Sequence, residues 1–509
     1  MSFRIVTTAL APEVPLPVQR DGGFPSTLLA ACIARPGTEA ALERLRDPRV
    51  LVVTTGQQPA LFTGPLYTVH KALSAAALAG ELERQWNRPV VPIFWVAGDD
   101  HDFAEAAHAA WIGADGSIRR ATLRQRPADA PMLPLYREPL GPEVDAALDS
   151  MAASLPESEF RDDTLAWLTR HYRPEVTIET GFSSALAELL APYGIVCLRT
   201  THPAFKRAAA PFILRALEDS GSLDADLAAR ASALAAGGRD PGVATGGGAT
   251  LVMIEGAAGR DRLVGSGNGF VTRRGEEHFT LRELHEVADR TPERLSPNVL
   301  LRPAIESALL PTVAYAAGPG ELRYLALTPP IYERLSIPLQ TPVPRWSGIV
   351  VGARVDRALA KFGFSLEDLA QPVSTLESRV VRSRLPAEVD LDLSSLEALL
   401  GERYDALRDT AGRIDPTLVP MIDAQRARGL DGVGRVERKL VKHLRRRIDV
   451  ELRQVTLAHN AVWPEGVPQE RVLSVASFLA RHGRAVLDAA LATASAWYRG
   501  ALESSGAPV

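Results

Sequence analysis

A short polar stretch, GDDHDF at residues 98–103, directly follows the apolar run VVPIFWVA. Crowded carboxylates repel one another, so such a cluster is costly unless a function uses it. These side chains could act as a general base, ligate a divalent metal or hold a substrate ammonium group, and histidine suits proton transfer near neutral pH. The structural alternative is an aspartate cap on a helix over FAEAAHAAW. Because one cap explains only one aspartate, the candidate catalytic residues are Asp99, Asp100, His101 and Asp102.

A second polar stretch, TGQQPALFTGPLYTVHK at residues 55–71, also follows an apolar run. Proline is favoured in the first turn of a helix, which predicts a helix with Gly64 as N-cap and Pro65 at its first position. Free N–H groups at a helix N-terminus attract anions, so this is a candidate phosphate or carboxylate site. The alternative is an ordinary strand-to-helix connection whose glutamines bond to the backbone. The candidate binding residues are Gly56, Gln57, Gln58, Thr63, Gly64, Tyr67 and Lys71.

Two further stretches carry polar side chains at predicted turns. SPNVLLRPAIESALLPTVAYAAGPGELRYLAL contains an arginine before a helix-like segment and, after an apolar run, a glycine-rich turn with one glutamate. Glutamate there could bind an amine or hydroxyls, whereas an acidic first helical turn is the structural alternative. The arginine of PVPRW could clamp a carboxylate or phosphate, or lie on a surface linker. The candidate binding residues are Arg302, Gly318, Gly320, Glu321 and Arg345.

These residues need a scaffold, and the first 350 residues supply one by alternating strand-like and helix-like segments. The apolar runs lack polar alternation, which indicates strands buried on both faces of a parallel sheet. Strand, helix and strand in succession predict βαβ units. Neither a GxGxxG fingerprint nor a GxxxxGK[ST] phosphate loop is present. The predicted strands are 49–56, 89–98, 193–200 and 311–318, and the clearest helix is 65–86.

The sequence changes character twice beyond this core. A glycine-rich segment at 235–250 precedes short alternating runs, which predict an antiparallel insertion at about 235–295. The glycines could cradle phosphate, but a surface loop is the interpretation we favour because the P-loop spacing is missing. Long charged helices at 392–416 and 434–464 carry one apolar stripe and predict an antiparallel coiled-coil hairpin. The predicted domains are 1–365 for the core with its insertion, 366–465 for the coiled coil, and 466–509 for a helical segment returning to the core.

Bulk properties exclude some classes of protein. The 509 residues are too many for one ordinary core, and a net charge of −4 gives no general attraction to nucleic acid or membrane. The two cysteines, Cys32 and Cys197, form neither a disulfide framework nor a zinc motif. The first residues lack a signal peptide's apolar core, and no segment has about 18 consecutive apolar residues. We therefore expect a cytoplasmic protein that binds neither nucleic acid nor membranes.

Taken together, the motifs resemble one family, the bacterial bacillithiol-biosynthesis cysteine-adding enzymes called BshC. The resemblance runs from about residue 50 to 490 and is strongest in TGQQPALFTGPLYTVHK and AGDDHDF. One departure is Glu306, where the family more often has glutamine. The other matching stretches, in the same order as in the family, are SPNVLLRP, PTVAYAAGPGELRY, PVPRWS, RIDPTL, VERKLVKHLRRR and PQERVLSVASFLARHG.

The resemblance implies a Rossmann-like core related to the nucleotidyl-transferase folds, with connecting-peptide insertions and a C-terminal coiled coil that mediates homodimerisation. It also implies a ligase that joins the carboxyl group of cysteine to the amine of glucosaminyl malate, as the last step of bacillithiol synthesis. A carboxylate must be activated before an amine can attack it, so ATP with Mg²⁺ is the expected co-substrate. We expect no tightly bound cofactor and assign no metal site.

Two other functions stay open from the residues alone. The first is a nucleotide-binding scaffold or dimerisation protein without its own chemistry, whose working part is the coiled coil. The second is a metal-dependent hydrolase built on the aspartates and histidine of GDDHDF. Metal ligands are usually spread over several strand ends rather than gathered in one turn, which disfavours the hydrolase.

Overall fold

The computed structural model describes residues 3–8 and 13–504. Two compact units divide the chain, one made of residues 1–350 with 469–509 and the other of residues 351–468. The first boundary lies earlier than the predicted residue 365. Helix α13 (Ala353–Phe362) accounts for the difference, because it packs against α17 (Asp449–Val462) of its own unit.

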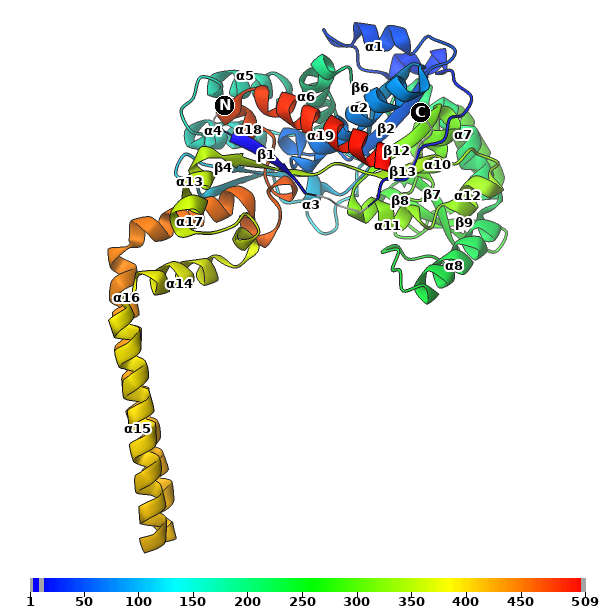
Figure 1. Ribbon diagram of the computed structural model, residues 1–509. Helices are drawn as coiled ribbons and strands as arrows, with labels where there is room; N and C mark the ends of the chain where they lie inside the picture. Colours follow the sequence, from blue (N-terminus) through cyan, green and yellow to red (C-terminus); the bar gives the residue numbers. More distant parts are fainter. Residues whose placement is uncertain (1–2, 9–12, 505–509) are drawn as a thin grey trace. The chain divides into compact units, whose positions relative to one another are not determined.

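Five parallel strands form the central sheet of the first unit (Figure 1). The four apolar runs that predict strands are all strands. The fifth strand has proline at two of its four positions, which is why the sequence indicates an extended linker there. It lies at the sheet edge, where missing N–H donors are tolerated. In order across the sheet the strands are β13 (Thr341–Pro344), β12 (Thr312–Ala317), β2 (Leu51–Gln57), β3 (Val90–Val96) and β6 (Val196–Arg199).

The strand order defines where a ligand should bind. Numbered along the chain from β2 to β13, the five strands read 3-2-1-4-5 across the sheet. This is the order of doubly wound nucleotide-binding folds. It reverses between β2 and β12, and ligands of open α/β sheets bind at such a switch point, beyond the carboxyl ends of the strands. The predicted Rossmann-like core is confirmed.

Both faces of the sheet are covered, as the unbroken apolar runs predict. Along β3, Phe94 and Val96 belong to one hydrophobic core, whereas Ile93 and Trp95 belong to the core on the opposite face. Helices α2 and α19 lie side by side in the first core (Figure 1), and α7 lies in the second. The bounds of these helices are Tyr67–Trp86 for α2, Ala485–Ser504 for α19 and Pro203–Glu218 for α7.

An antiparallel sheet of five strands is inserted between β6 and β12, which confirms the antiparallel strands predicted after the glycine-rich stretch. The N–H groups of Gly246 and Gly248 in that stretch bond to the carboxylate of Asp224, so the loop binds a side chain of its own chain. In order across the sheet the strands are β10 (His278–Phe279), β9 (Gly269–Thr272), β8 (Gly259–Ser266), β7 (Ala249–Gly256) and β11 (Leu295–Pro297).

The segment after GDDHDF differs from the prediction. A helix was expected over FAEAAHAAW, but α3 covers only Phe103–Ala106, and His108–Ile112 is strand β4. This strand pairs with β5 (Ile118–Thr122) in a separate hairpin. The helix was expected because alanine has a high helix propensity. Burial of Trp111 and its neighbours favours the strand instead.

The second unit contains the predicted antiparallel coiled-coil hairpin, with different limits. Helices α15 (Ala387–Ile414) and α16 (Val419–Arg447) run alongside each other in Figure 1, joined by the turn Pro416–Leu418. The second helix begins 15 residues before the predicted residue 434 and continues through glycines, whose helix propensity is low, and it ends before 464 because the backbone bends at Ile448.

In the part of the chain that the structure describes, no helix is long and apolar enough to cross a membrane. The remaining helices and strands have the following bounds. The first unit also contains β1 (Phe3–Thr7), α1 (Glu39–Arg44), α4 (Glu143–Ser154), α5 (Arg161–His171), α6 (Ile178–Leu190), α8 (Ser220–Ala236), α9 (Leu281–Arg290), α10 (Arg302–Leu309), α11 (Pro319–Leu325), α12 (Pro329–Arg334) and α18 (Ala476–His482); β14 is Gly348–Gly352, and the second unit contains α14 (Val373–Arg384).

Candidate functional site

A pocket of about 480 Å³ lies at the switch point, between the ends of β2 and β12. It is lined by thirteen of the sixteen candidate residues, from five separate stretches of the sequence. The roles given to these residues remain predictions, but the fold brings the residues together. They are Gly56, Gln57, Gln58, Tyr67, Lys71, Asp99, Asp100, His101, Arg302, Gly318, Gly320, Glu321 and Arg345.

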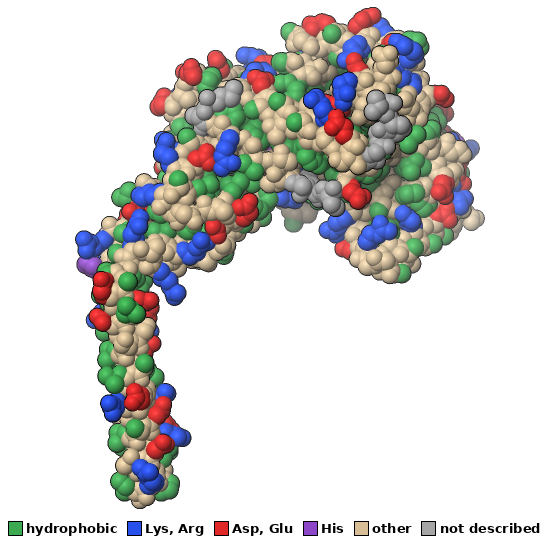
Figure 2. Space-filling view, in the orientation of Figure 1, with side chains coloured by type: hydrophobic (Ala, Val, Ile, Leu, Met, Phe, Trp, Pro, Cys, Tyr) green, Lys and Arg blue, Asp and Glu red, His purple; other side chains and the backbone are tan. Residues whose placement is uncertain are grey.

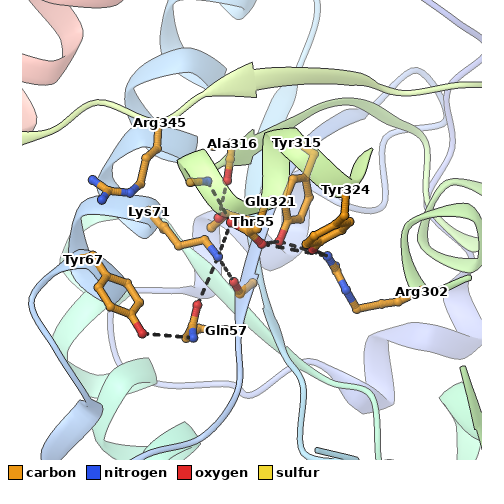
Figure 3. A network of polar contacts seen from close by, with 12 residues as sticks. Thr55, Gln57, Tyr67, Lys71, Arg302, Tyr315, Ala316, Glu321, Tyr324 and Arg345 are labelled. Carbon is orange, nitrogen blue, oxygen red and sulfur yellow. Dashed lines mark hydrogen bonds and ion pairs between the residues drawn. The ribbon is translucent and has the colours of Figure 1, made fainter. Parts of the chain in front are cut away.

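The buried Lys71 and the partly buried Glu321 form an ion pair in the wall of the pocket (Figure 3). Lys71 reaches from α2 with its Nζ 2.7 Å from Glu321 Oε2, and it also donates to Gly56 O and to Gln57 Oε1. The Glu321 carboxylate accepts from the N–H of Gly318 at 2.8 Å and from the Tyr315 hydroxyl at 2.6 Å. Helix α2 is thereby joined to the turn after β12 across the switch point.

Arg302 extends this network from α10. Its Nη2 donates to the hydroxyls of Tyr315 at 3.3 Å and Tyr324 at 3.2 Å, and its Nη1 lies 3.2 Å from Glu306 Oε2. We call Lys71, Arg302, Tyr315, Glu321 and Tyr324 the switch-point cluster. Its polar atoms already bond to one another, so a ligand here would join an ordered network rather than meet free charges.

Burial governs the protonation of the switch-point cluster. Burial lowers the pKa of Lys71, and the Glu321 carboxylate opposes this effect. For Glu321, burial acts to raise the pKa, but Lys71 and Arg302 overcome it and hold the pKa below its usual value. Each charge thus favours the ionised form of the other, and loss of either would leave its partner without a counter-charge.

Glu306, the departure from the family's glutamine, lies fully buried behind the cluster. Burial raises its pKa to about 7, with Arg302 acting in the opposite direction. Its carboxylate also accepts from the Thr54 hydroxyl. Near neutral pH the side chain is thus often protonated, and a protonated carboxyl offers a donor and an acceptor as a glutamine amide does.

We expect Glu306→Gln to stabilise the protein above pH 7. A carboxyl whose folded pKa is raised favours folding at low pH, and this contribution is lost as the pH rises through 7, because the folded state must then ionise a buried group. The free energy of unfolding of the variant should exceed that of the parent protein by about 2 kcal/mol at pH 8.5 and should differ little from it at pH 5. Urea unfolding of both proteins at the two pH values measures this, and an equal gain at both would contradict it.

Asp100 and His101 line the same pocket from the turn after β3. Asp100 Oδ1 accepts from the N–H groups of His101 at 2.7 Å and Asp102 at 3.0 Å. This bonding rigidifies the turn while the second carboxylate oxygen has no partner among the described residues. Asp100 is therefore the carboxylate of GDDHDF that is best placed to accept a proton in the pocket.

The other two aspartates of GDDHDF have structural partners. Asp99 pairs with the buried Lys206, which also donates to Leu295 O at 3.0 Å. Asp102 caps α3 by accepting from the N–H of Glu105 at 3.0 Å, and it does not line the pocket. The catalytic assignment of Asp102 is therefore replaced by the capping alternative, and Asp99 serves a charge pair at the pocket wall.

His101 contacts a residue that the sequence did not single out. Arg260 of β8 places its Nη1 3.1 Å from His101 Nδ1. Burial lowers the pKa of His101, and Arg260 adds to this effect while Asp100 opposes it. His101 is therefore neutral near pH 7. No motif marks Arg260, because an arginine in a short strand of the insertion reads as a surface residue.

Arg345 is not a free anion clamp. Its guanidinium forms a two-pronged pair with Glu470, with Nη1 at 2.9 Å from Oε2, and both side chains are buried. The same carboxylate accepts from Ser347 Oγ at 2.8 Å and contacts His70 Nδ1 at 2.8 Å. Arg345 thus fixes the returning C-terminal segment, which the sequence could not show because Glu470 lies 125 residues further along the chain.

The predicted anion site at Gly64 is also wrong. Helix α2 begins at Tyr67, and Pro65 forms a β-bridge with Ser474. The N–H of Gly64 bonds to Leu61 O and that of Leu66 bonds to Leu473 O, so the C-terminal segment takes the place of an anion. Thr63 is fully buried with its N–H on the Tyr172 hydroxyl, and neither Thr63 nor Gly64 lines the pocket.

Two arginines without partners line the pocket instead. Within residues 3–8 and 13–504, the guanidinium groups of Arg262 in β8 and of Arg471 form no hydrogen bond or ion pair. Burial lowers the pKa of Arg262, and Arg273 and Arg260 add to this effect. Unpaired cations in a pocket attract anionic ligands. Arg471 lies in the PQER motif, but the other residues of the pocket are distant from it in sequence, so the sequence did not place it in the site.

Within the same described ranges, no three His, Cys, Asp or Glu side chains are grouped so that they could hold a metal ion. Both cysteines are free, and burial raises the pKa of Cys197 and that of Cys32, the latter to about 12. A free thiol with a raised pKa is a poor nucleophile, so neither cysteine is a candidate for covalent chemistry.

Comparison with known families agrees with this architecture. Residues 29–346 match the model of the bacillithiol biosynthesis BshC N-terminal Rossmann-like domain, and residues 348–496 match that of the BshC C-terminal coiled-coil domain. A Rossmann-like domain and a coiled-coil domain are the features that the two descriptions name. The chain belongs to the BshC family.

Individual relatives extend over most of the chain. A protein of Salinibacter ruber is 32% identical over 454 residues, covering 89% of this chain and 82% of the relative. A protein of Koribacter versatilis is 32% identical, with 89% and 84% covered, and one of Bacillus licheniformis is 27% identical, with 87% and 82% covered. Each of the three bears the name "Putative cysteine ligase BshC".

Proposed function

We propose that this protein is an ATP-dependent ligase that joins the carboxyl group of cysteine to the amine of glucosaminyl malate, as the last step of bacillithiol synthesis. The observation that carries the proposal is one pocket, in a chain of the BshC family, that holds Asp100 and His101 together with two arginines that have no partner among the described residues. Amide formation needs a neutral amine, and glucosaminyl malate and ATP are both anions. The pocket offers a proton acceptor and cations for these needs.

Asp100 and His101 would handle the acceptor amine. An ammonium group must lose a proton before it can attack a carboxyl carbon, so a nearby base is required. Among the described residues, one carboxylate oxygen of Asp100 has no partner, and His101 is neutral and lines the same pocket. The two side chains would orient the glucosamine nitrogen, and Asp100 would accept its proton as the new C–N bond forms and the bond from the carboxyl carbon to the phosphate-bearing activating group breaks.

Arg262 and Arg471 would hold the anionic ends of the substrates. Malate carries two carboxylates and ATP carries several charges, and arginine binds both groups through paired N–H donors. Mg²⁺ would enter the pocket bound to the phosphate oxygens of ATP, and the ion would neutralise phosphate charge. This assignment replaces Arg345 and the backbone near Gly64, whose donors have partners.

The hairpin of α15 and α16 would join two copies of the chain in a homodimer. Large apolar side chains stay exposed along it in the single chain, and Figure 2 shows them between charged groups on the hairpin. Exposed apolar stripes of this kind mark protein interfaces. We place the reaction in the cytoplasm, where ATP and reduced cysteine are available. The exposed residues include Leu391, Leu396, Leu399, Leu407, Ile414, Met421, Val436 and Leu440.

The test is direct synthesis. Purified protein, whose dimeric state is checked by light scattering, would be incubated with cysteine, glucosaminyl malate and Mg-ATP. We expect mass spectrometry to detect an amide heavier than glucosaminyl malate by cysteine minus water, formed only when nucleotide is present. Serine in place of cysteine is the control for the amino acid. A folded protein that gives no product with any nucleoside triphosphate would refute the ligase.

A further inference from the structure

Arg260 makes the only contact to His101 that constrains the imidazole ring nitrogens in the part of the chain that the structure describes. An arginine guanidinium has five N–H donors and no acceptor, and it does not lose its proton in proteins. A hydrogen bond between Arg260 Nη1 and His101 Nδ1 therefore runs from the arginine to the histidine. Nδ1 must carry the lone pair, so the proton of the neutral ring lies on Nε2.

We infer that Arg260 is a positioning residue that holds His101 as a neutral hydrogen-bond donor at Nε2. This inference rests on the proposed function and divides the work within it: Asp100 accepts the proton of the amine, whereas His101 donates a hydrogen bond. The natural target is the oxygen that becomes negative when the amine attacks the activated carboxyl group of cysteine. Donors aimed at such an oxygen are among the strongest contributions to catalysis of acyl transfer.

The surroundings of Arg260 hold its side chain in one place. Its Nε donates to Ser296 Oγ at 2.9 Å and its Nη2 donates to Pro297 O at 2.8 Å, so each nitrogen of the guanidinium has a partner. Its backbone is fixed as well, because its N–H bonds to Met132 O at 2.8 Å. The neighbouring Gly259 has φ +81°, and a Cβ there would lie 2.4 Å from Met132 backbone atoms. The insertion thus presents Arg260 from a rigid strand.

Protonation of His101 is disfavoured by the same contact. A proton on Nδ1 would set two N–H donors and two positive charges against each other at 3.1 Å. The charged groups that act on His101 are Arg260 and Arg274, which disfavour its cation, and Asp100 and Asp102, which favour it. Nε2 has no partner among the described residues, and the ring lines the pocket, so the donor is available to a substrate.

Nitrogen NMR of the substrate-free protein labelled with ¹⁵N-histidine tests this inference, with the His101 signals assigned by their loss in His101→Gln. We expect an unprotonated Nδ1 and a protonated Nε2 at pH 7, retained well below the ordinary histidine pKa of about 6.5. In Arg260→Gln the titration midpoint should rise by about half a pH unit or more, and both tautomers should be populated. Arg260→Lys, which keeps a charged donor, should restore the Nε2–H form.

Arg262→Gln is the matched control, because Arg262 lies two residues further along the same strand and does not contact His101. It should leave the tautomer and the midpoint of His101 as in the parent protein. A parent protein with His101 protonated at Nδ1, or an Arg260→Gln variant with an unchanged midpoint, would overturn the inference. If Arg260→Gln does not fold, the tautomer of His101 in the parent protein and in Arg260→Lys still tests the inference. Because no substrate is used, the result stands even if the ligase assay fails.

Discussion

Asp100→Asn is expected to lower kcat of the ligase reaction about 10²- to 10⁴-fold while the protein stays folded. Asparagine has the same shape, and its amide oxygen can still accept the two N–H bonds that Asp100 Oδ1 accepts from His101 and Asp102. What disappears is the basic oxygen that faces the pocket. The affinity for glucosaminyl malate should change much less than kcat, because the anion-binding arginines are untouched.

Asp102→Asn is the matched control two residues further along the same turn. Asparagine caps helices as well as aspartate does, so α3 should keep its N-terminal bond. We expect kcat within about threefold of the parent protein, since Asp102 does not line the pocket. Steady-state kinetics with a coupled nucleotide assay measures both variants. Equal losses for the two aspartates would show that the turn as a whole, and not Asp100, supports activity.

Glu470→Gln is expected to destabilise the first unit by about 3–5 kcal/mol. The change leaves the Arg345 guanidinium buried without a counter-charge and replaces one oxygen of the carboxylate that bonds Arg345, Ser347 and His70 by an amide nitrogen. Burial acts to raise the pKa of Glu470, but His70 and Arg345 hold it far below the usual range. A depressed pKa contributes stability above the ordinary glutamate pKa of about 4.3 and loses it as the pH falls below that value. The difference between parent and variant should therefore shrink below pH 4.

Guanidinium unfolding followed by tryptophan fluorescence measures this effect. Arg471→Gln, at the next position, removes an exposed and unpaired charge and should change the free energy of unfolding by less than about 0.5 kcal/mol. The double variant Arg345→Met with Glu470→Leu removes both charges and should recover part of the loss, because breaking a buried pair costs more than replacing it. A single variant as stable as the parent would show that the pair does not hold the C-terminal segment.

The sheet was predictable because its strands are buried on both faces. Strand β3 is apolar throughout and β2 begins with three apolar residues, which leaves a parallel strand as the simplest interpretation, and polar residues at or after their ends mark the ligand edge. Where the local signal conflicted with tertiary packing, the prediction was wrong. The alanines after Phe103 favoured a helix where β4 forms. The glycines before 434 have a low helix propensity, so the first half of α16 was not predicted.

The candidate site was predictable where each residue lies close in sequence to a strand end. Lys71 and Glu321 belong to the segments that follow β2 and β12, so the switch point brings them together. Partners from distant segments could not be found in this way. Arg260 comes from the insertion and Glu470 from the returning C-terminal segment. Only the tertiary fold shows that Arg260 bonds to His101 and Glu470 to Arg345.

The most direct test of the account is a crystal structure with glucosaminyl malate, cysteine and a non-hydrolysable ATP analogue bound. We expect density for the sugar amine within hydrogen-bond distance of Asp100, and for the malate carboxylates beside Arg262 or Arg471. The thiol-bearing substrate should lie between them and the switch-point cluster. Substrate density elsewhere on the protein, with the pocket at the ends of β2 and β12 empty, would contradict the assignment of this pocket as the active site.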